Sequence, residues 1–244
     1  MPPPRLRGRG RLEIRRSQDV RACVCVFAKA PLPGQVKTRL SESIGAANAA
    51  AFARASLQDT WTQVCELPWA RPVLATSSPP EPGWQPRPQG EWWLQGRGDP
   101  GTRLERVLTW AIAVGDAALV IAGDAPGIPH SLLEDAVESL ESCDVALGPS
   151  GDGGFYLIGA RTCPEGLIAG LPWSRPDRLA MLRRRLMSFG LSFRLLDRWD
   201  GVDDLADLAV LGRRLEHGGI EAPETERVLR EIDPRRARKT TPTV

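Results

Sequence analysis

Short apolar segments alternate with longer segments of helical pattern along most of this 244-residue chain. The clearest apolar runs are ACVCVFA at 22–28 and AALVIAGD at 117–124. Between such runs, apolar residues recur three and four positions apart, as in SLLEDAVESLES at 131–142, which has Ser131 as its expected N-cap. Alternation of this kind is typical of a mostly parallel sheet covered by helices. The sequence therefore predicts an α/β fold.

Further elements follow the same alternation. Strands are expected at 71–76, 91–96, 144–150, 155–160 and 191–199. Helices are expected at 41–67 (one or two of them), 102–115, 177–189 and twice after the last strand. A proline- and glycine-rich loop is expected at 77–90, where regular structure is disfavoured. No internal repeat interrupts the pattern.

Both ends of the chain are basic, although its net charge is only +2. Residues 1–21 hold seven arginines against two acids, and residues 234–244 hold four basic residues and no acid. Such stretches are typical of disordered tails, so we expect one folded domain over residues 22–233. Arginine-rich tails can bind nucleic acid, but no recognition module accompanies these. We therefore expect no nucleic-acid partner.

Composition also limits the location and the chemistry. No apolar run approaches the roughly 20 residues of a membrane span, and the N-terminal MPPPRLRGRGRLEIRR lacks the apolar core of a secretory signal. The five cysteines have no C-x-x-C spacing, as a zinc site would often show. With only two histidines, the chain has few residues for a histidine-based zinc site or a serine–histidine triad. The cytoplasm is the expected location.

The segments that follow four predicted strands carry most of the reactive residues. KAPLPGQVKTRL follows the first strand, GDAPGIP the fourth, GPSGDGG the fifth and DRWDGVDDLADL the last. Ligands in open α/β sheets bind beyond the carboxyl ends of the strands. Cations occupy the first segment and carboxylates the other three, which favours a phosphate-bearing ligand with a bound cation at this edge.

The first segment has two interpretations. Gly34 permits close approach of the backbone to a ligand, and Lys37 and Arg39 can neutralise phosphate charge. The segment lacks the G-x-x-x-x-G-K spacing of a P-loop. An ordinary strand-to-helix connection with solvated Lys and Arg is the alternative.

The carboxylates also have two interpretations each. Asp124 can hold a hard cation such as Mg²⁺ between phosphates, or it can cap a turn. Asp152, flanked by glycines, either faces the ligand or belongs to a hairpin turn. Most of the four acids between 200 and 207 are expected to be solvated or to cap the helix starting near Leu205. One of them can point at the metal.

Five segments together resemble the GT-A-fold, glycosyltransferase-like proteins known as radical-SAM/selenodomain-associated transferases. These are distant relatives of the nucleotidyltransferases that act on sugar phosphates, molybdopterin and phospholactate. The resembling segments are FAKAPLPGQVKTRL (27–40), QGRGDPGTRLERVL (95–108), IAGDAPGIP (121–129), DVALGPSGDGGFYLIG (144–159) and WDGVDDLADL (199–208). The resemblance implies a GT-A three-layer α/β/α sandwich that binds a nucleotide and Mg²⁺ or Mn²⁺.

The resemblance also implies roles for individual residues. Nucleotide binding falls to Pro33, Gly34, Lys37, Arg39 and Gly98. Metal binding falls to Asp124 and Asp203, and catalysis to Lys37 and Asp152. In these roles Lys37 stabilises charge on the leaving group, and Asp152 positions or deprotonates an acceptor hydroxyl.

The implied function is metal-dependent glycosyl transfer from a nucleotide-sugar to a small-molecule acceptor. The same residues would serve the alternative, nucleotidyl transfer to a small phosphorylated substrate with release of pyrophosphate. The chain departs from the family pattern at Pro100 and Thr102, where leucine and glutamate are usual, and at Gly201 and Asp204, where aspartate and threonine are usual. A catalytically degenerate nucleotide-binding protein is the third possibility.

Overall fold

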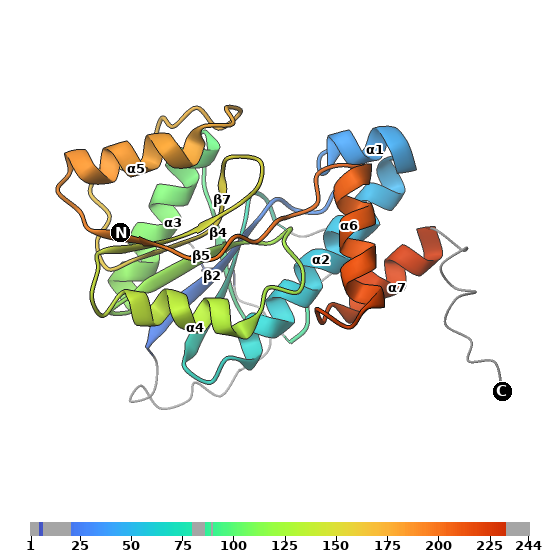
Figure 1. Ribbon diagram of the computed structural model, residues 1–244, viewed down its shortest axis with the longest axis horizontal. Helices are drawn as coiled ribbons and strands as arrows, with labels where there is room; N and C mark the ends of the chain where they lie inside the picture. Colours follow the sequence, from blue (N-terminus) through green and yellow to red (C-terminus); the bar gives the residue numbers. More distant parts are fainter. Residues whose placement is uncertain (1–4, 7–20, 80–85, 89, 233–244) are drawn as a thin grey trace.

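The computed structural model describes residues 5–6, 21–79, 86–88 and 90–232 (Figure 1). Its strands are β1 (Arg5–Leu6), β2 (Ala22–Ala28), β3 (Ala70–Thr76), β4 (Glu91–Leu94), β5 (Ala118–Ala122), β6 (Val145–Pro149), β7 (Phe155–Ala160) and β8 (Phe193–Leu195). Its helices are α1 (Thr38–Ile44), α2 (Ala46–Glu66), α3 (Pro100–Val114), α4 (His130–Ser139), α5 (Arg178–Ser188), α6 (Leu205–Glu216) and α7 (Pro223–Ile232).

The strands form one sheet in the order β1-β4-β3-β2-β5-β7-β6-β8. Among the described strands, β1 and β7 run opposite to the other six, because β7 pairs antiparallel with both β5 and β6 and β1 pairs antiparallel with β4. The carboxyl ends of β2, β5, β6 and β8 therefore lie at the same edge. This topology confirms the predicted α/β class with a mostly parallel sheet.

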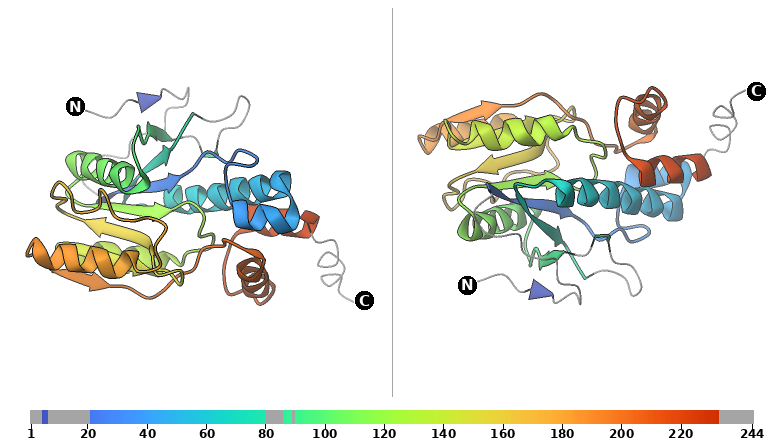
Figure 2. Two further views of the ribbon diagram at one scale, coloured as in Figure 1. Left: turned by 90° about the horizontal axis from the view of Figure 1, so that it is seen from above. Right: turned by 90° about the horizontal axis from the view of Figure 1, so that it is seen from below.

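Helices cover both faces of the sheet, which gives three layers (Figure 2). Helices α2 and α4 pack on one face, and α3 and α5 pack on the other. Leu119 and Val120, neighbours on β5, are buried in opposite cores because side chains alternate across a strand. Burial on both faces explains why the central strands are apolar without a break.

Helices α1, α6 and α7 form a separate group beyond the sheet, around the N-terminal half of α2 (Figure 1). Leu40 of α1, Phe52 of α2, Leu211 of α6 and Leu229 of α7 meet in its apolar centre. The segment from β8 to α6 crosses from the sheet to this group. Its acids are thereby placed at the carboxyl edge of the sheet.

Some local expectations differ from the structure. Arg5–Leu6 forms β1 inside the stretch expected to be a disordered tail, while the rest of that stretch before residue 21 and the tail at 234–244 lie outside the described residues. Helix α4 has Pro129 at its cap position, so Ser131 is inside the first turn and not the N-cap. No helix in the described part of the chain is both long enough and apolar enough to cross a membrane.

Candidate functional site

A pocket of about 760 Å³ opens at the carboxyl edge of the sheet. Residues after β2, β5, β6 and β8 line it, together with parts of α2 and α3 and the segment before α5. The four segments that the sequence analysis selected therefore meet at one place. They meet because β2, β5, β6 and β8 run in the same direction, so their carboxyl ends lie at one edge of the sheet.

Lys37 is a nearly buried charged group of the pocket. Its Nζ donates hydrogen bonds to Asp124 Oδ2 at 2.6 Å and to Asp203 Oδ1 at 2.9 Å. The Lys37 side chain is 6% exposed, whereas the side chains of Asp124 and Asp203 are 47% and 48% exposed. The structure thus brings the two predicted metal ligands together, and it places the predicted phosphate-binding ammonium between them.

The Lys37 ammonium lies between opposite charges, and the pKa values of Lys37 and Asp124 reflect this. Burial by itself lowers the pKa of Lys37, but the charges of Asp124 and Asp203 outweigh burial, and the net effect raises that pKa. Burial by itself raises the pKa of Asp124, but the Lys37 ammonium outweighs it, and the net effect lowers that pKa. Lys37 and Asp124 are therefore both charged at neutral pH.

The backbone of Lys37 is also unusual. It is left-handed, with φ 47° and ψ 47°, and within the described part of the chain it is the only residue other than glycine with a positive φ. Such a conformation costs roughly 1 kcal/mol or more and persists where surrounding contacts hold it, often at functional sites. Here the contacts are the two ion pairs.

Asp124 and Asp203 fit the donor set of a shared divalent cation. Mg²⁺ typically takes one or two carboxylates and completes its shell with substrate phosphates and water. Lys37 contacts one oxygen of each carboxylate, and each carboxylate has a second oxygen. The described residues contain no cluster of three or more His, Cys, Asp or Glu able to hold a metal. The geometry therefore fits a cation held jointly with a ligand, not one enclosed by protein.

Asp152 belongs to the loop between β6 and β7. Its Oδ1 accepts hydrogen bonds from Ser150 Oγ at 2.5 Å and from the Gly154 amide at 3.0 Å, and its Oδ2 accepts from Arg178 Nη2. Burial raises the pKa of Asp152, but these contacts outweigh it, and the pKa is lowered. A carboxylate stabilised in its ionised form is a weak proton acceptor. The arrangement therefore favours a role of Asp152 in positioning Arg178 over its predicted role as a base.

The glycines of this loop are explained by close packing as well as by turn geometry. A Cβ on Gly151 would collide with the Arg198 guanidinium, and one on Gly154 would collide with that of Arg178. Gly153 has φ +76°, and its Cα lies against the backbone of Pro176. The sequence GDGG therefore lets two arginines and a neighbouring segment pack against the loop.

Several pocket residues were not anticipated from the sequence. Arg103, Arg178 and Trp173 come from α3 and from the start of α5 and the segment before it, not from the strand ends. Trp173 packs edge-on against Phe155, with ring centroids 5.9 Å apart, and its carbonyl accepts from Arg178 Nη1 at 2.8 Å. Arg103 lies within the resembling segment 95–108, but no role was expected for it. Trp173 and Arg178 lie outside the five resembling segments, and nothing in local spacing indicates that their segment folds over the pocket.

The predicted nucleotide-binding residues divide into two groups. Lys37 and Arg39 line the pocket, where Arg39 Nη2 pairs with Asp204 Oδ2 at 2.6 Å. Pro33, Gly34 and Gly98 are not among the lining residues. Gly34 has φ +73°, a conformation that favours glycine in this turn, and the space where a Cβ would lie is open. The nucleotide-binding role of these three residues stays a prediction.

Comparisons with known proteins agree with this fold. The model of a family described as "Uncharacterized protein conserved in bacteria (DUF2064)" matches residues 60–175. The chain is similar to the structure of a putative nucleotide-diphospho-sugar transferase from Desulfovibrio desulfuricans G20, at 29% identity and a TM-score of 0.79, over 88% of this chain and 96% of that chain. The fold is therefore that of a nucleotide-diphospho-sugar transferase.

Weaker likenesses extend to nucleotidyltransferases. A cytidylyltransferase from Leptospira borgpetersenii matches at 13% identity and a TM-score of 0.49, over 92% of this chain and 99% of that chain. A CMP:2-keto-3-deoxy-manno-octonic acid synthetase matches at 15% identity and a TM-score of 0.49, over 82% of this chain and 100% of that chain. No curated protein sequence matches the chain.

Proposed function

We propose that this protein is a nucleotide-dependent transferase that moves a glycosyl group from a nucleotide-sugar to a small-molecule acceptor with the help of Mg²⁺ or Mn²⁺. The observation that carries the proposal is the contact of Lys37 Nζ with Asp124 and Asp203 at the carboxyl edge of the sheet. The likeness to the Desulfovibrio protein over 88% of this chain supports the nucleotide-sugar part. The proposed site of action remains the cytoplasm.

The donor phosphates would lie beside Lys37. Two of its three N–H donors go to carboxylates, which leaves one for a phosphate oxygen. Arg39, with a side chain 67% exposed, can turn toward the same phosphates. Asp124 and Asp203 would hold a divalent cation, which when bound neutralises charge on the leaving phosphate.

The acceptor would lie toward the loop between β6 and β7. Asp152 fixes Arg178 there, and the Trp173 ring forms an apolar wall next to them. An arginine held by a carboxylate presents its remaining donors in a set direction. Arg178 and Trp173 therefore orient the acceptor, while Lys37 stabilises the leaving group.

Thermal unfolding with nucleoside diphosphates, triphosphates and nucleotide-sugars, each with Mg²⁺, Mn²⁺ or EDTA, tests the proposal. A ligand of the native state raises the melting temperature by mass action. We expect a metal-dependent shift with one nucleotide-sugar, and its loss in Asp124→Asn. The matched control is Asp116→Asn, which changes an exposed aspartate at the opposite end of β5.

Product analysis then separates the reactions. Release of a nucleoside diphosphate in the presence of an acceptor supports glycosyl transfer. Release of pyrophosphate from a triphosphate supports nucleotidyl transfer instead, and binding without turnover across an acceptor panel supports a degenerate nucleotide-binding protein. An unchanged melting temperature with every nucleotide contradicts the proposal.

A further inference from the structure

The charged residues that line the pocket are not all paired. Six cationic side chains line it, and four have a carboxylate within ion-pair distance: Lys37, Arg39, Arg178 and Arg198. Lys29 and Arg103 have no such partner among the described residues. The positive charges of these two side chains are therefore not compensated by an ion pair within the described part of the chain, although the pocket as a whole is lined by equal numbers of cations and carboxylates.

Arg103 is held in place by a fully buried glutamine. Gln95 is 1% exposed, and its Nε2 donates to the carbonyl oxygens of Ala28 at 2.8 Å and Ala75 at 2.9 Å. With its amide nitrogen engaged at the ends of β2 and β3, its Oε1 faces Arg103 and accepts from Arg103 Nη1 at 3.0 Å. A buried amide with this many partners is a rigid support.

The guanidinium is only partly satisfied by this contact. Arg103 Nε is buried and has no hydrogen-bond partner in the described residues, and an unsatisfied buried donor costs free energy. A small movement of Arg103 toward a pocket ligand would satisfy it. Lys29 directly follows Ala28, whose carbonyl oxygen accepts from Gln95 Nε2, and it lines the pocket together with Arg103.

We propose that Arg103 and Lys29 form a second anion subsite of the pocket, which binds a phosphate group of the ligand. A planar guanidinium and an ammonium that line one pocket suit phosphate, because the guanidinium offers two parallel donors and both groups offer charge. The inference rests on the proposed function, since it assumes a phosphate-bearing ligand. It adds a contact that is separate from Lys37 and lies on the β4 side of the sheet.

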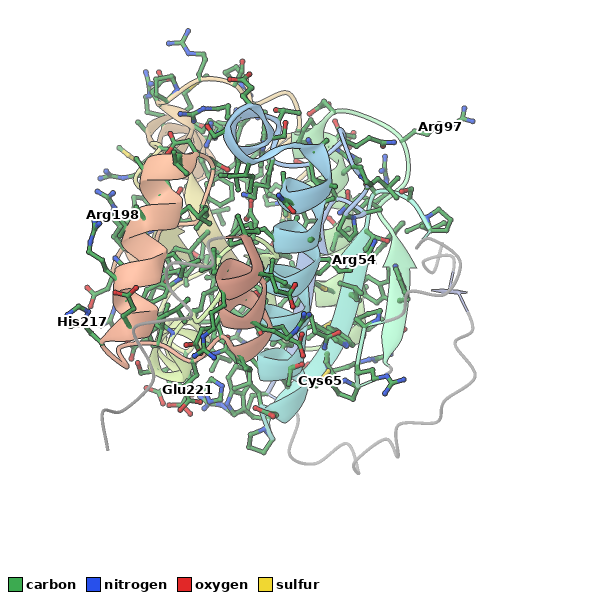
Figure 3. All side chains as sticks on the ribbon, turned by 90° about the vertical axis from the view of Figure 1, so that its right-hand side faces the viewer. Arg54, Cys65, Arg97, Arg198, His217 and Glu221 are labelled. Carbon is green, nitrogen blue, oxygen red and sulfur yellow. The ribbon has the colours of Figure 1, made fainter. Side chains whose placement is uncertain are left out.

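Isothermal titration calorimetry with linear tripolyphosphate, in EDTA, tests the subsite. We expect Arg103→Met and Lys29→Met each to weaken binding by about tenfold, the usual scale for loss of a charge-assisted contact. Arg103→Lys should weaken it less, because it keeps the charge. The matched control is Arg97→Met, since Arg97 lies exposed between β4 and α3, extends outward from the molecule (Figure 3) and does not line the pocket. It should bind within about twofold of wild type.

Lys37→Met in the same titration separates this inference from the proposed function. If Lys37→Met weakens binding while Arg103→Met and Lys29→Met resemble the Arg97→Met control, the second subsite is wrong and the proposed function stands. If the reverse holds, the subsite stands and the role of Lys37 is wrong. A wild-type protein that binds no tripolyphosphate overturns both. Urea unfolding of each variant confirms that the folded protein is being titrated.

Discussion

At the scale of single residues, Lys37 decides how the pocket is organised. Its ammonium is nearly buried, its backbone is left-handed, and its two partners come from the turn after β5 and from the segment before α6. Removing one partner of a buried ion pair leaves the others facing each other without compensation. The residue therefore has a structural role besides the one proposed in ligand binding.

We predict that Lys37→Met lowers the free energy of unfolding by about 1–3 kcal/mol, because Asp124 and Asp203 then repel each other. Urea denaturation at pH 7 measures the change. Asp203→Asn added to Lys37→Met should recover part of the loss. The control is Lys29→Met, an exposed lysine without a carboxylate partner in the described residues, which should change the free energy by less than about 0.5 kcal/mol. A fully stable Lys37→Met protein would contradict the prediction.

At the scale of elements, helix α7 is capped by another helix. Asp59 of α2 is 5% exposed, and its two carboxylate oxygens accept from the amides of Glu224 at 3.0 Å and Thr225 at 2.8 Å. The first amides of a helix have no hydrogen-bond acceptor within the helix. Asp59 of α2 therefore supplies acceptors for two amides of α7 across the interface between the helices. The apolar residues Val228 and Leu229 of α7 pack in the same region.

We predict that Asp59→Ala destabilises the protein by about 1–2 kcal/mol, because two buried amides lose their acceptors. Amide hydrogen exchange in α7 should be faster in Asp59→Ala than in the wild type, and this increase should be larger in α7 than in the central strands. Asp59→Asn, which keeps one acceptor oxygen, should cost less. Glu66→Ala, an exposed site at the end of α2, serves as the control. Equal exchange in α7 of the wild type and Asp59→Ala would argue against the cap.

A second element contact joins the starts of β6 and β8. Asp144 Oδ2 accepts from Ser192 Oγ at 2.6 Å and from the Ser192 amide at 2.8 Å. These hydrogen bonds, from the hydroxyl and then from the amide, lower the pKa of Asp144. A lowered pKa in the folded state means that the contact contributes to stability above the unfolded pKa of about 3.9. That contribution is lost as the pH falls through the folded pKa.

The sign of this linkage predicts how Asp144→Asn behaves. Urea unfolding at pH 7 should find the variant less stable than wild type, because Asn cannot carry the charge that strengthens both hydrogen bonds. As the pH falls from about 4 to about 2, the difference in unfolding free energy should shrink, because wild-type Asp144 becomes neutral too. A difference that stays constant over this range would contradict the prediction.

At the scale of the whole molecule, the sheet joins two apolar cores. The fully buried Leu119 of β5 packs with α2 and α4, while Val120 faces the core of α3 and α5. Since β5 belongs to both cores, a cavity made in this strand weakens the whole domain. The pocket at the end of β5 depends on the same strand.

We predict that Leu119→Ala lowers the free energy of unfolding by about 2–5 kcal/mol, the range for buried large-to-small substitutions. Far-ultraviolet circular dichroism and tryptophan fluorescence should then report one shared transition at lower urea. Leu205→Ala, in which a side chain 52% exposed is removed, is the control and should change little. Separate transitions by the two probes would argue for independently unfolding parts.

The sequence by itself determined the class of fold and the edge at which the site forms. Apolar runs such as 22–28 and their alternation with helical spacing are local properties, so they can be recognised without tertiary structure. The expectation that Asp124 and Lys37 follow strands ending at one edge needed only the parallel arrangement. The expectation that some of the acids between 200 and 207 cap the helix starting near Leu205 is confirmed, because α6 begins with a capping box formed by Asp204 and Asp207.

Only the tertiary structure decided which charges pair. Lys37 is 87 residues from Asp124 and 166 from Asp203, and Arg178 is 26 from Asp152. Such partners depend on strand order and on the antiparallel insertion of β7, which no local pattern specifies. For the same reason the support of Arg103 by Gln95 was invisible in the sequence: a hydrogen bond across strand ends exists only once the sheet has formed.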